Sequence, residues 1–256
     1  MMRSLRLLSV YTRRTFLEWM AFRSFLFTLV VNQAVTPLLG LAVWSAALPG
    51  DTSVSTYYVA LLAVQLMTTS SEYYTITMVI YEGSLNDDLL RPHPFVIRPL
   101  GENLAQRIWY LLIGLPIIAI AVAVAGVSFS PEDLLIAIPA LALAATLGFL
   151  FQFALALSAL WTQQASGVGE FGATMIFLLG GAAAPVTLFP ESIRPFGEAL
   201  PFRAMLGFPA EIASGSLSGA QILGGYGWQV LWIAVFAPVA AFVWRSGVRR
   251  YTALGG

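Results

Sequence analysis

Lysine and cysteine are absent from the 256 residues, and His93 is the only histidine. Without lysine, the chain has no GxxxxGK[ST] phosphate-binding loop and no lysine-bound cofactor. Without cysteine, it has no thiol nucleophile, disulfide framework or haem-attachment motif, and a single histidine excludes a histidine-rich metal site. We therefore expect no cofactor and no metal in this chain. If the protein performs uphill work, another chain hydrolyses the ATP.

Charge is also scarce, because only 10% of the residues are charged whereas 58% are hydrophobic. The mean hydropathy of +0.80 is typical of an integral membrane protein. One crossing of the hydrocarbon core needs about 20 apolar helical residues. Continuous apolar runs such as LIGLPIIAIAVAVAG favour helices over the alternating strands of a β-barrel. The fold class expected is an all-α polytopic membrane protein, a single transmembrane domain over 1–256, with spans at 24–48, 57–81, 103–127, 132–160, 169–189 and 225–246.

The arginines predict the orientation, because cytoplasmic flanks of membrane spans accumulate positive charge. With these spans, eleven of the thirteen arginines fall on one side, and only Arg194 and Arg203 fall on the other. Both termini are therefore expected in the cytoplasm, with the PGDTSVST and SFSPED loops outside. The arginine-rich N-terminus does not have the pattern of a cleavable signal peptide.

The first segment, residues 1–22, mixes arginines with Leu5, Leu8, Phe16 and Trp19. This basic amphipathic pattern suits a helix that lies in the inner headgroup layer, in contact with membrane lipid. The alternative is a positive flank that only fixes topology.

The most polar stretch, EGSLNDDLLRPHP at 82–94, follows the second predicted span. Ser84 with Asp87 three residues later resembles a capping box, and the prolines at 92 and 94 end any helix. The pattern predicts a short cytoplasmic helix over about 84–91.

Leu85 and Leu89 lie on one face of that predicted helix, with Leu90 beside them. We expect an exposed apolar knob with acidic flanks, which suits docking into the groove of a partner. Metal binding by Asp87 and Asp88 is disfavoured, because neighbouring helical side chains diverge by about 100°. A solvated helix that only joins two spans remains the alternative.

The residues of the 82–94 stretch resemble a motif of a known family. The chain resembles permease subunits of ABC-2 type exporters, in the group with a G-x-L-x-x-x-L-L-R-P signature after the second span. Two further blocks agree, FPESIRPFGEALPFRAMLGFP before the last span and WRSGVRRYTALGG at the end. Ser84 and Asn86 depart from the acidic residues expected there. The signature is matched by Gly83, Leu85, Leu89, Leu90, Arg91 and Pro92.

The resemblance implies an N-terminal elbow helix, six spans, a coupling helix in the 82–94 loop and re-entrant helices in the outer segment. That segment, 190–222, is long for a loop and rich in apolar residues, so two short helices that dip back into the outer leaflet are expected. A surface-lying amphipathic loop is the alternative. The ATPase-coupling residues that the resemblance implies are Glu82, Gly83, Leu85, Asp87, Asp88, Leu89, Leu90 and Arg91.

Glu72, in TTSSEYYTITM, is the one carboxylate expected deep within a span. A buried acid is costly, so Glu72 is expected to face a pathway, a partner or the bundle interior, with Asn32 and Gln33 as further pathway candidates. No nearby opposite charge is expected, so a passing cation could neutralise it. A structural, hydrogen-bonded acid is an equal alternative. Gln152 is more typical of contacts between helices.

The function expected is the permease subunit of an ATP-driven exporter in a bacterial inner membrane, and not an enzyme. It would pair with a second copy or a dissimilar permease and with ATPase chains that bind ATP and magnesium, with no nucleic acid as partner. The cargo is expected to be a hydrophobic or cationic small molecule, the cationic class by resemblance only. A secondary transporter usually has more intramembrane ionisable residues and inverted repeats. An intramembrane hydrolase needs a nucleophile and a base or metal ligands within the bilayer.

Overall fold

A computed structural model describes residues 2–162 and 165–251, which form helices and loops without a strand. The last residues of the C-terminal block, 252–256, lie outside the described part. The α-helices are α1 (Met2–Met20), α2 (Arg23–Ala47), α3 (Thr52–Thr68), α4 (Glu72–Tyr81), α5 (Leu85–Leu89), α6 (Ile97–Ala125), α7 (Pro131–Ala156), α8 (Ser166–Leu179), α9 (Arg194–Ala199), α10 (Pro201–Met205), α11 (Gly207–Ala213) and α12 (Gly219–Val248).

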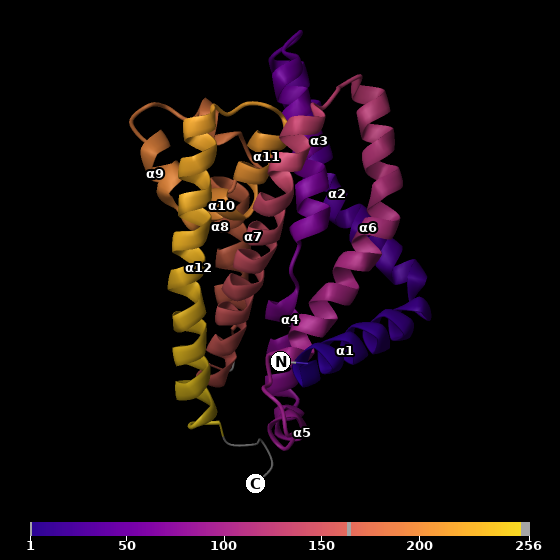
Figure 1. The fold of residues 1–256 in the computed structure, drawn as a ribbon, viewed down its shortest axis with the longest axis vertical. Coiled ribbons are helices and arrows are strands. Elements are labelled where there is room, and N and C mark those ends of the chain that lie inside the picture. Colours follow the sequence, from indigo (N-terminus) through magenta and orange to yellow (C-terminus); the bar gives the residue numbers. More distant parts are fainter. Residues whose placement is uncertain (1, 163–164, 252–256) are drawn as a thin grey trace.

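The helices form an elongated bundle with two distinct ends (Figure 1). The start of α1, the short helix α5 and the end of α12 lie at one end, which we name the α5 end. Helices α9, α10 and α11 gather near the opposite end, which we name the α11 end. The arrangement places the 82–94 loop far from the 190–222 segment.

Four of the described helices are long and apolar enough to cross a membrane: α2, α6, α12, and α7 with its 3-10 extension to Leu160. They correspond to four of the six predicted spans, although α6 and α12 begin about one to two turns earlier than predicted. In α12 the early start is explained by a capping box between Ser218 and Gln221. The all-helical membrane class is confirmed, whereas the count of six spans stays a prediction.

The second predicted span, 57–81, is not one helix. Helix α3 begins earlier, at Thr52, and ends at Thr68, and α4 begins at Glu72. The break falls on Thr69, Ser70 and Ser71, where Thr69 has extended backbone (ψ 135°) and its hydroxyl donates to Gln65 O. Hydroxyl side chains compete for backbone hydrogen bonds in this way, and an acid suits the positive N-terminal end of α4.

The fifth predicted span, 169–189, is also wrong in extent. Helix α8 covers only Ser166–Leu179 and is too short to cross by itself. Gly180 and Gly181 end it, and Gly181 has a φ of +97°, which a residue with a side chain rarely adopts. The Tyr57 hydroxyl donates a hydrogen bond to Gly181 O and fixes this turn against α3.

The segment after α8 contains three short α-helices, α9 to α11, rather than the two expected between 190 and 222. Helix α11 is entirely buried. Gln229 of α12 is also buried, and its amide donates to Ala140 O of α7 and to Ala204 O of α10, both at 2.9 Å. The segment is therefore packed into the bundle through α10 and α11, whereas α9 is partly exposed, with Phe196 at 65%. Its depth in a membrane stays a prediction.

The largest part of the core lies where α3, α7 and α11 meet, around Tyr58, Leu61, Phe208 and Ile212. Helix α1 lies at a steep angle to this bundle and packs along α6 (Figure 1). Phe16 of α1 stacks on Trp109 of α6 with ring centroids 4.8 Å apart. The predicted N-terminal segment is thus helical in its described part, from residue 2, whereas its position in the headgroup layer stays a prediction.

Candidate coupling segment and intramembrane cavity

Helix α5 begins after Gly83, whose φ of +75° explains why the signature has glycine there. The helix is shorter than the predicted 84–91, and the expected capping box does not form. Ser84 already has helical backbone angles, whereas a capping residue needs extended ones. Its hydroxyl donates instead to Val79 O at 3.3 Å.

The three leucines of the segment do not form one knob. Leu85 is fully buried, in a cluster that includes Ile80, Phe95 and Phe153. Leu89 is 40% exposed and Leu90 is 85% exposed. The expectation of a shared Leu85–Leu89 surface is therefore wrong, because the turn at Gly83 directs Leu85 into the bundle. The exposed apolar surface consists of Leu89 and Leu90, which we name the α5 tip.

The two aspartates of the segment also differ. Asp87 is exposed, whereas Asp88 is 3% exposed and contacts two arginines. Its carboxylate oxygens lie 2.5 Å from Arg98 of α6 and 3.4 Å from Arg91, both to guanidinium nitrogens. Asp88 therefore fixes the α5 tip to the start of α6.

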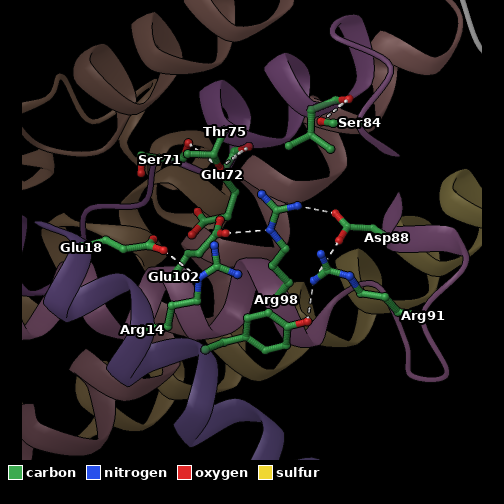
Figure 2. A network of polar contacts seen from close by, with 12 residues as sticks. Arg14, Glu18, Ser71, Glu72, Thr75, Ser84, Asp88, Arg91, Arg98 and Glu102 are labelled. Atoms are coloured by element: carbon green, nitrogen blue, oxygen red, sulfur yellow. Dashed lines mark hydrogen bonds and ion pairs between the residues drawn. The ribbon is translucent and has the colours of Figure 1, made fainter. Parts of the chain in front are cut away.

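The contacts continue from these arginines to α1 (Figure 2). The Arg91 guanidinium donates to the Tyr11 hydroxyl at 2.8 Å, and that hydroxyl lies 3.0 Å from His93 Nε2. Arg98 also pairs with Glu102 at 2.8 Å. Glu82, another predicted coupling residue, is exposed. We name these residues the α5-end network; its members are Tyr11, Asp88, Arg91, His93, Arg98 and Glu102.

A cavity of about 320 Å³ lies inside the bundle, between α2, the α3–α4 break, α7, α8 and α10. Its polar lining consists of amides and hydroxyls. Tyr74 and Phe177 line it and are 62% and 44% exposed, so the cavity opens to the surface beside them. The polar residues that line it are Gln33, Gln65, Gln152, Thr36, Thr68, Thr69, Ser70 and Tyr74.

The three pathway candidates lie in different surroundings. Gln33 lines the cavity, and its side-chain oxygen accepts a hydrogen bond from Gln65 Nε2 at 3.2 Å. Asn32 is exposed on α2 and is not among the lining residues. Glu72 is 3% exposed and is also outside the cavity lining.

Glu72 has an opposite charge nearby, contrary to expectation. Its carboxylate accepts from Asn103 Nδ2, and Asn103 Oδ1 accepts from Arg107 Nε at 2.6 Å. Arg107 also donates to Met67 O at 2.6 Å and to Ala145 O at 3.1 Å. The bond to Met67 O satisfies a carbonyl at the end of α3, and the bond to Ala145 O ties the break to α7. We name Glu72, Asn103 and Arg107 the α3–α4 brace.

Sequence reasoning missed Arg107, because the predicted third span began at 103 and placed this residue near a loop. The signal was present in GENLAQR, where an amide and a guanidinium stand four residues apart on one helix face. It also missed the pair of Arg203 and Glu211, which were expected in an outer loop. Their side chains are 8% and 1% exposed, with the nearest nitrogen and oxygen 2.5 Å apart.

The described residues contain no cluster of three or more histidines, aspartates or glutamates that could hold a metal ion. The arrangement offers a tethered apolar tip and an uncharged cavity, which suit docking and binding.

Neither the curated proteins nor the solved structures compared with the chain include a match. The model of one family, described as ABC-2 family transporter protein, matches residues 18–255. The chain therefore belongs to the ABC-2 family of transporters, as a membrane-embedded permease that is not itself catalytic.

Proposed function

We propose that this permease is the transmembrane subunit of an ATP-driven exporter and that a separate ATPase docks on the α5 tip. The family implies an ABC ATPase as partner. The observation that carries the docking site is Leu90, which is 85% exposed on a segment that the buried Asp88 fixes to α6. An exposed leucine pair gains by burial in a partner's groove, and the salt bridges beneath it give a firm attachment.

The second half of the pathway is supplied by another copy of this chain or by a dissimilar permease. The complete assembly moves a hydrophobic or cationic small molecule outward, with ATP and magnesium bound only by the ATPase. Its setting is a bacterial inner membrane, with α1 in the inner headgroup layer and the α9–α11 segment in the outer leaflet.

Co-purification tests the docking site. Wild-type permease extracted in mild detergent is expected to retain an ATPase chain, and replacing Leu89 and Leu90 together by serine is expected to remove it. Leu112 and Leu115, on an exposed face of α6, give the matched control when replaced by serine. Full retention of the ATPase by the Leu89→Ser, Leu90→Ser variant would refute docking at the α5 tip. Wild-type permease purified without any ATPase would favour a secondary transporter.

Single-cysteine variants test the orientation, because the wild-type chain contains no cysteine. Ser53 and Ser128 are exposed beyond the ends of the spans, and Asn86 is exposed on α5. An impermeant maleimide added to intact cells is expected to label Ser53→Cys and Ser128→Cys, and to label Asn86→Cys only after the membrane is opened. Labelling of Asn86→Cys in intact cells would reverse the orientation.

A further inference from the structure

The intramembrane cavity has polar walls but no charge. Its lining includes three glutamine amides and five hydroxyl groups, and no aspartate, glutamate or arginine. Apolar side chains complete the wall, including Ile176, Phe177 and Leu206. A wall of this composition can donate and accept hydrogen bonds on one side and bury hydrocarbon on the other.

The charged groups near this space lie outside its lining: Glu72, Arg107 and the exposed Glu170, which accepts a hydrogen bond from the Tyr74 hydroxyl at 3.4 Å. Glu72 and Arg107 are joined through Asn103 in the α3–α4 brace, so each already has polar partners within the protein. Besides Asn103, Arg107 donates to one lining residue, Ser70, at 3.3 Å and to backbone oxygens of α3 and α7. Glu72 Oε2 is buried without a hydrogen-bond partner among the described residues, but Glu72 does not line the cavity. A cation in the cavity would therefore lose hydration without a carboxylate in the wall to replace it, which is costly in a medium of low dielectric constant.

One amide of the lining has spare hydrogen-bonding capacity. Gln65 Nε2 donates to Gln33, whereas Gln65 Oε1 is buried without a hydrogen-bond partner among the described residues. An unsatisfied buried acceptor costs about 1–3 kcal/mol. A hydrogen-bond donor on a ligand beside Gln65 removes that cost.

We propose that the cavity binds an uncharged amphipathic molecule, which the amides of Gln33, Gln65 and Gln152 recognise by hydrogen bonds and whose apolar part lies against Ile176 and Phe177. The proposal rests on the proposed transport function and narrows the cargo class, because it excludes the permanent cation that an isolated Glu72 suggested. Glu72 then has a structural role, in which it holds the broken α3–α4 pair through Asn103.

Two matched fluorescent probes test this assignment on the full chain in lipid nanodiscs, with whatever partner co-purifies. Dansyl N-propylamide is uncharged and has a hydrogen-bond donor. The second probe carries the same dansyl amide on a propyl chain that ends in trimethylammonium. Empty nanodiscs provide the background for partition into lipid. The uncharged probe is expected to bind at least tenfold more tightly than the cationic one.

Three variants locate the binding. Gln65→Met keeps the side-chain length and is expected to weaken binding of the uncharged probe three- to tenfold, about the value of one hydrogen bond. Gln152→Glu places a carboxylate in the lining and is expected to shift preference towards the cation. Glu72→Gln is expected to leave the ratio of the two affinities unchanged. A variant is accepted only if it elutes as a single species of wild-type size.

Opposite results overturn the proposal. Tighter binding of the cation by wild-type protein, together with loss of that preference in Glu72→Gln, would make Glu72 the recognition group. Unchanged affinities in both Gln65→Met and Gln152→Glu would place the ligand elsewhere. Failure of the transport proposal is distinguishable, because it appears as a missing ATPase in the co-purification and leaves probe binding unaffected.

Discussion

Buried charge is used in two different ways at the two ends of the molecule. At the α11 end, Arg203 and Glu211 stand eight residues apart, and both are almost fully removed from solvent. At the α5 end, Asp88 is equally buried, but Arg91 and Arg98 are 35% and 28% exposed. The first pair is local and enclosed. The second arrangement joins segments that are far apart in the sequence and reaches the surface.

The difference suggests different mechanical roles. A pair enclosed within α10 and α11 fixes the shape of one segment, and the Arg203 guanidinium also lies 5.8 Å from the Phe208 ring centroid. The α5-end network instead connects three elements: Asp88 of α5, Arg98 of α6 and Tyr11 of α1 (Figure 2). Movement of the α5 tip would therefore be passed to both α1 and α6, whereas the α11 end would stay rigid.

Removing one member of the enclosed pair is expected to have the largest effect. Glu211→Gln leaves the Arg203 guanidinium buried without a counter-charge, which costs about 3–5 kcal/mol. We expect a lower melting temperature and loss of monodisperse protein in fluorescence-detected size-exclusion chromatography. Glu191→Gln, an exposed acid at the same end, is the control and is expected to melt like wild type.

A double variant separates loss of the charge pair from loss of packing. Arg203→Met with Glu211→Leu removes both charges and keeps similar volumes, so it is expected to recover most of the lost stability. If Glu211→Gln alone melted like wild type, the pair would not be the rigid element proposed for the α11 end.

The long apolar helices could be predicted from the sequence, whereas the positions at which other helices break could not. The runs that became α2, α6, α7 and α12 are recognisable because each contains a window of 18 residues with high mean hydropathy. Residues 57–81 are also mostly apolar, but Thr69 bonds to the backbone of the preceding turn, and Ser70 and Ser71 have side-chain partners on α6. Whether three such residues bend, break or continue a helix depends on partners that are distant in sequence.

The candidate sites were predicted in the same uneven way. The signature correctly located a short helix, because glycine and proline mark its limits locally. The rotation of that helix against Phe95 and Phe153 decides which leucine is exposed. This rotation cannot be predicted from the sequence of the short helix alone. The opposite charge near Glu72 was missed for a similar reason, since Arg107 approaches it from another helix, whereas the role of Glu72 stays a prediction.

The second prediction compares two leucines within the α5 end itself. Leu85→Ala creates a cavity in a closed cluster and is expected to cost about 2–5 kcal/mol. Leu90→Ala changes an exposed side chain and is expected to shift stability by less than about 0.5 kcal/mol. Thermal melting of the two purified variants measures both. Equal melting temperatures would contradict the assignment of Leu85 to the buried core and of Leu90 to the exposed α5 tip.

A smaller loss than for Glu211→Gln or Leu85→Ala is expected for Asp88→Asn, which removes a charge from a network whose arginines still reach solvent. The amide introduced by this substitution can still accept one hydrogen bond from Arg98, and both guanidinium groups are hydrated in part, so the loss is about 1–3 kcal/mol. This is less than for Glu211→Gln, where neither partner reaches water. Melting temperature measures the loss, with Asp87→Asn as the exposed control beside it.

The same variant distinguishes a linking network from a purely structural one. If the network transmits movement from the α5 tip, Asp88→Asn should retain the docked ATPase, because Leu89 and Leu90 are unchanged. ATP hydrolysis should continue while transport of a fluorescent cargo into inverted vesicles falls. Asp87→Asn should keep hydrolysis and transport in their wild-type ratio. If Asp88→Asn also kept the wild-type ratio of transport to ATP hydrolysis, the α5-end network would have a purely structural role, like the pair of Arg203 and Glu211.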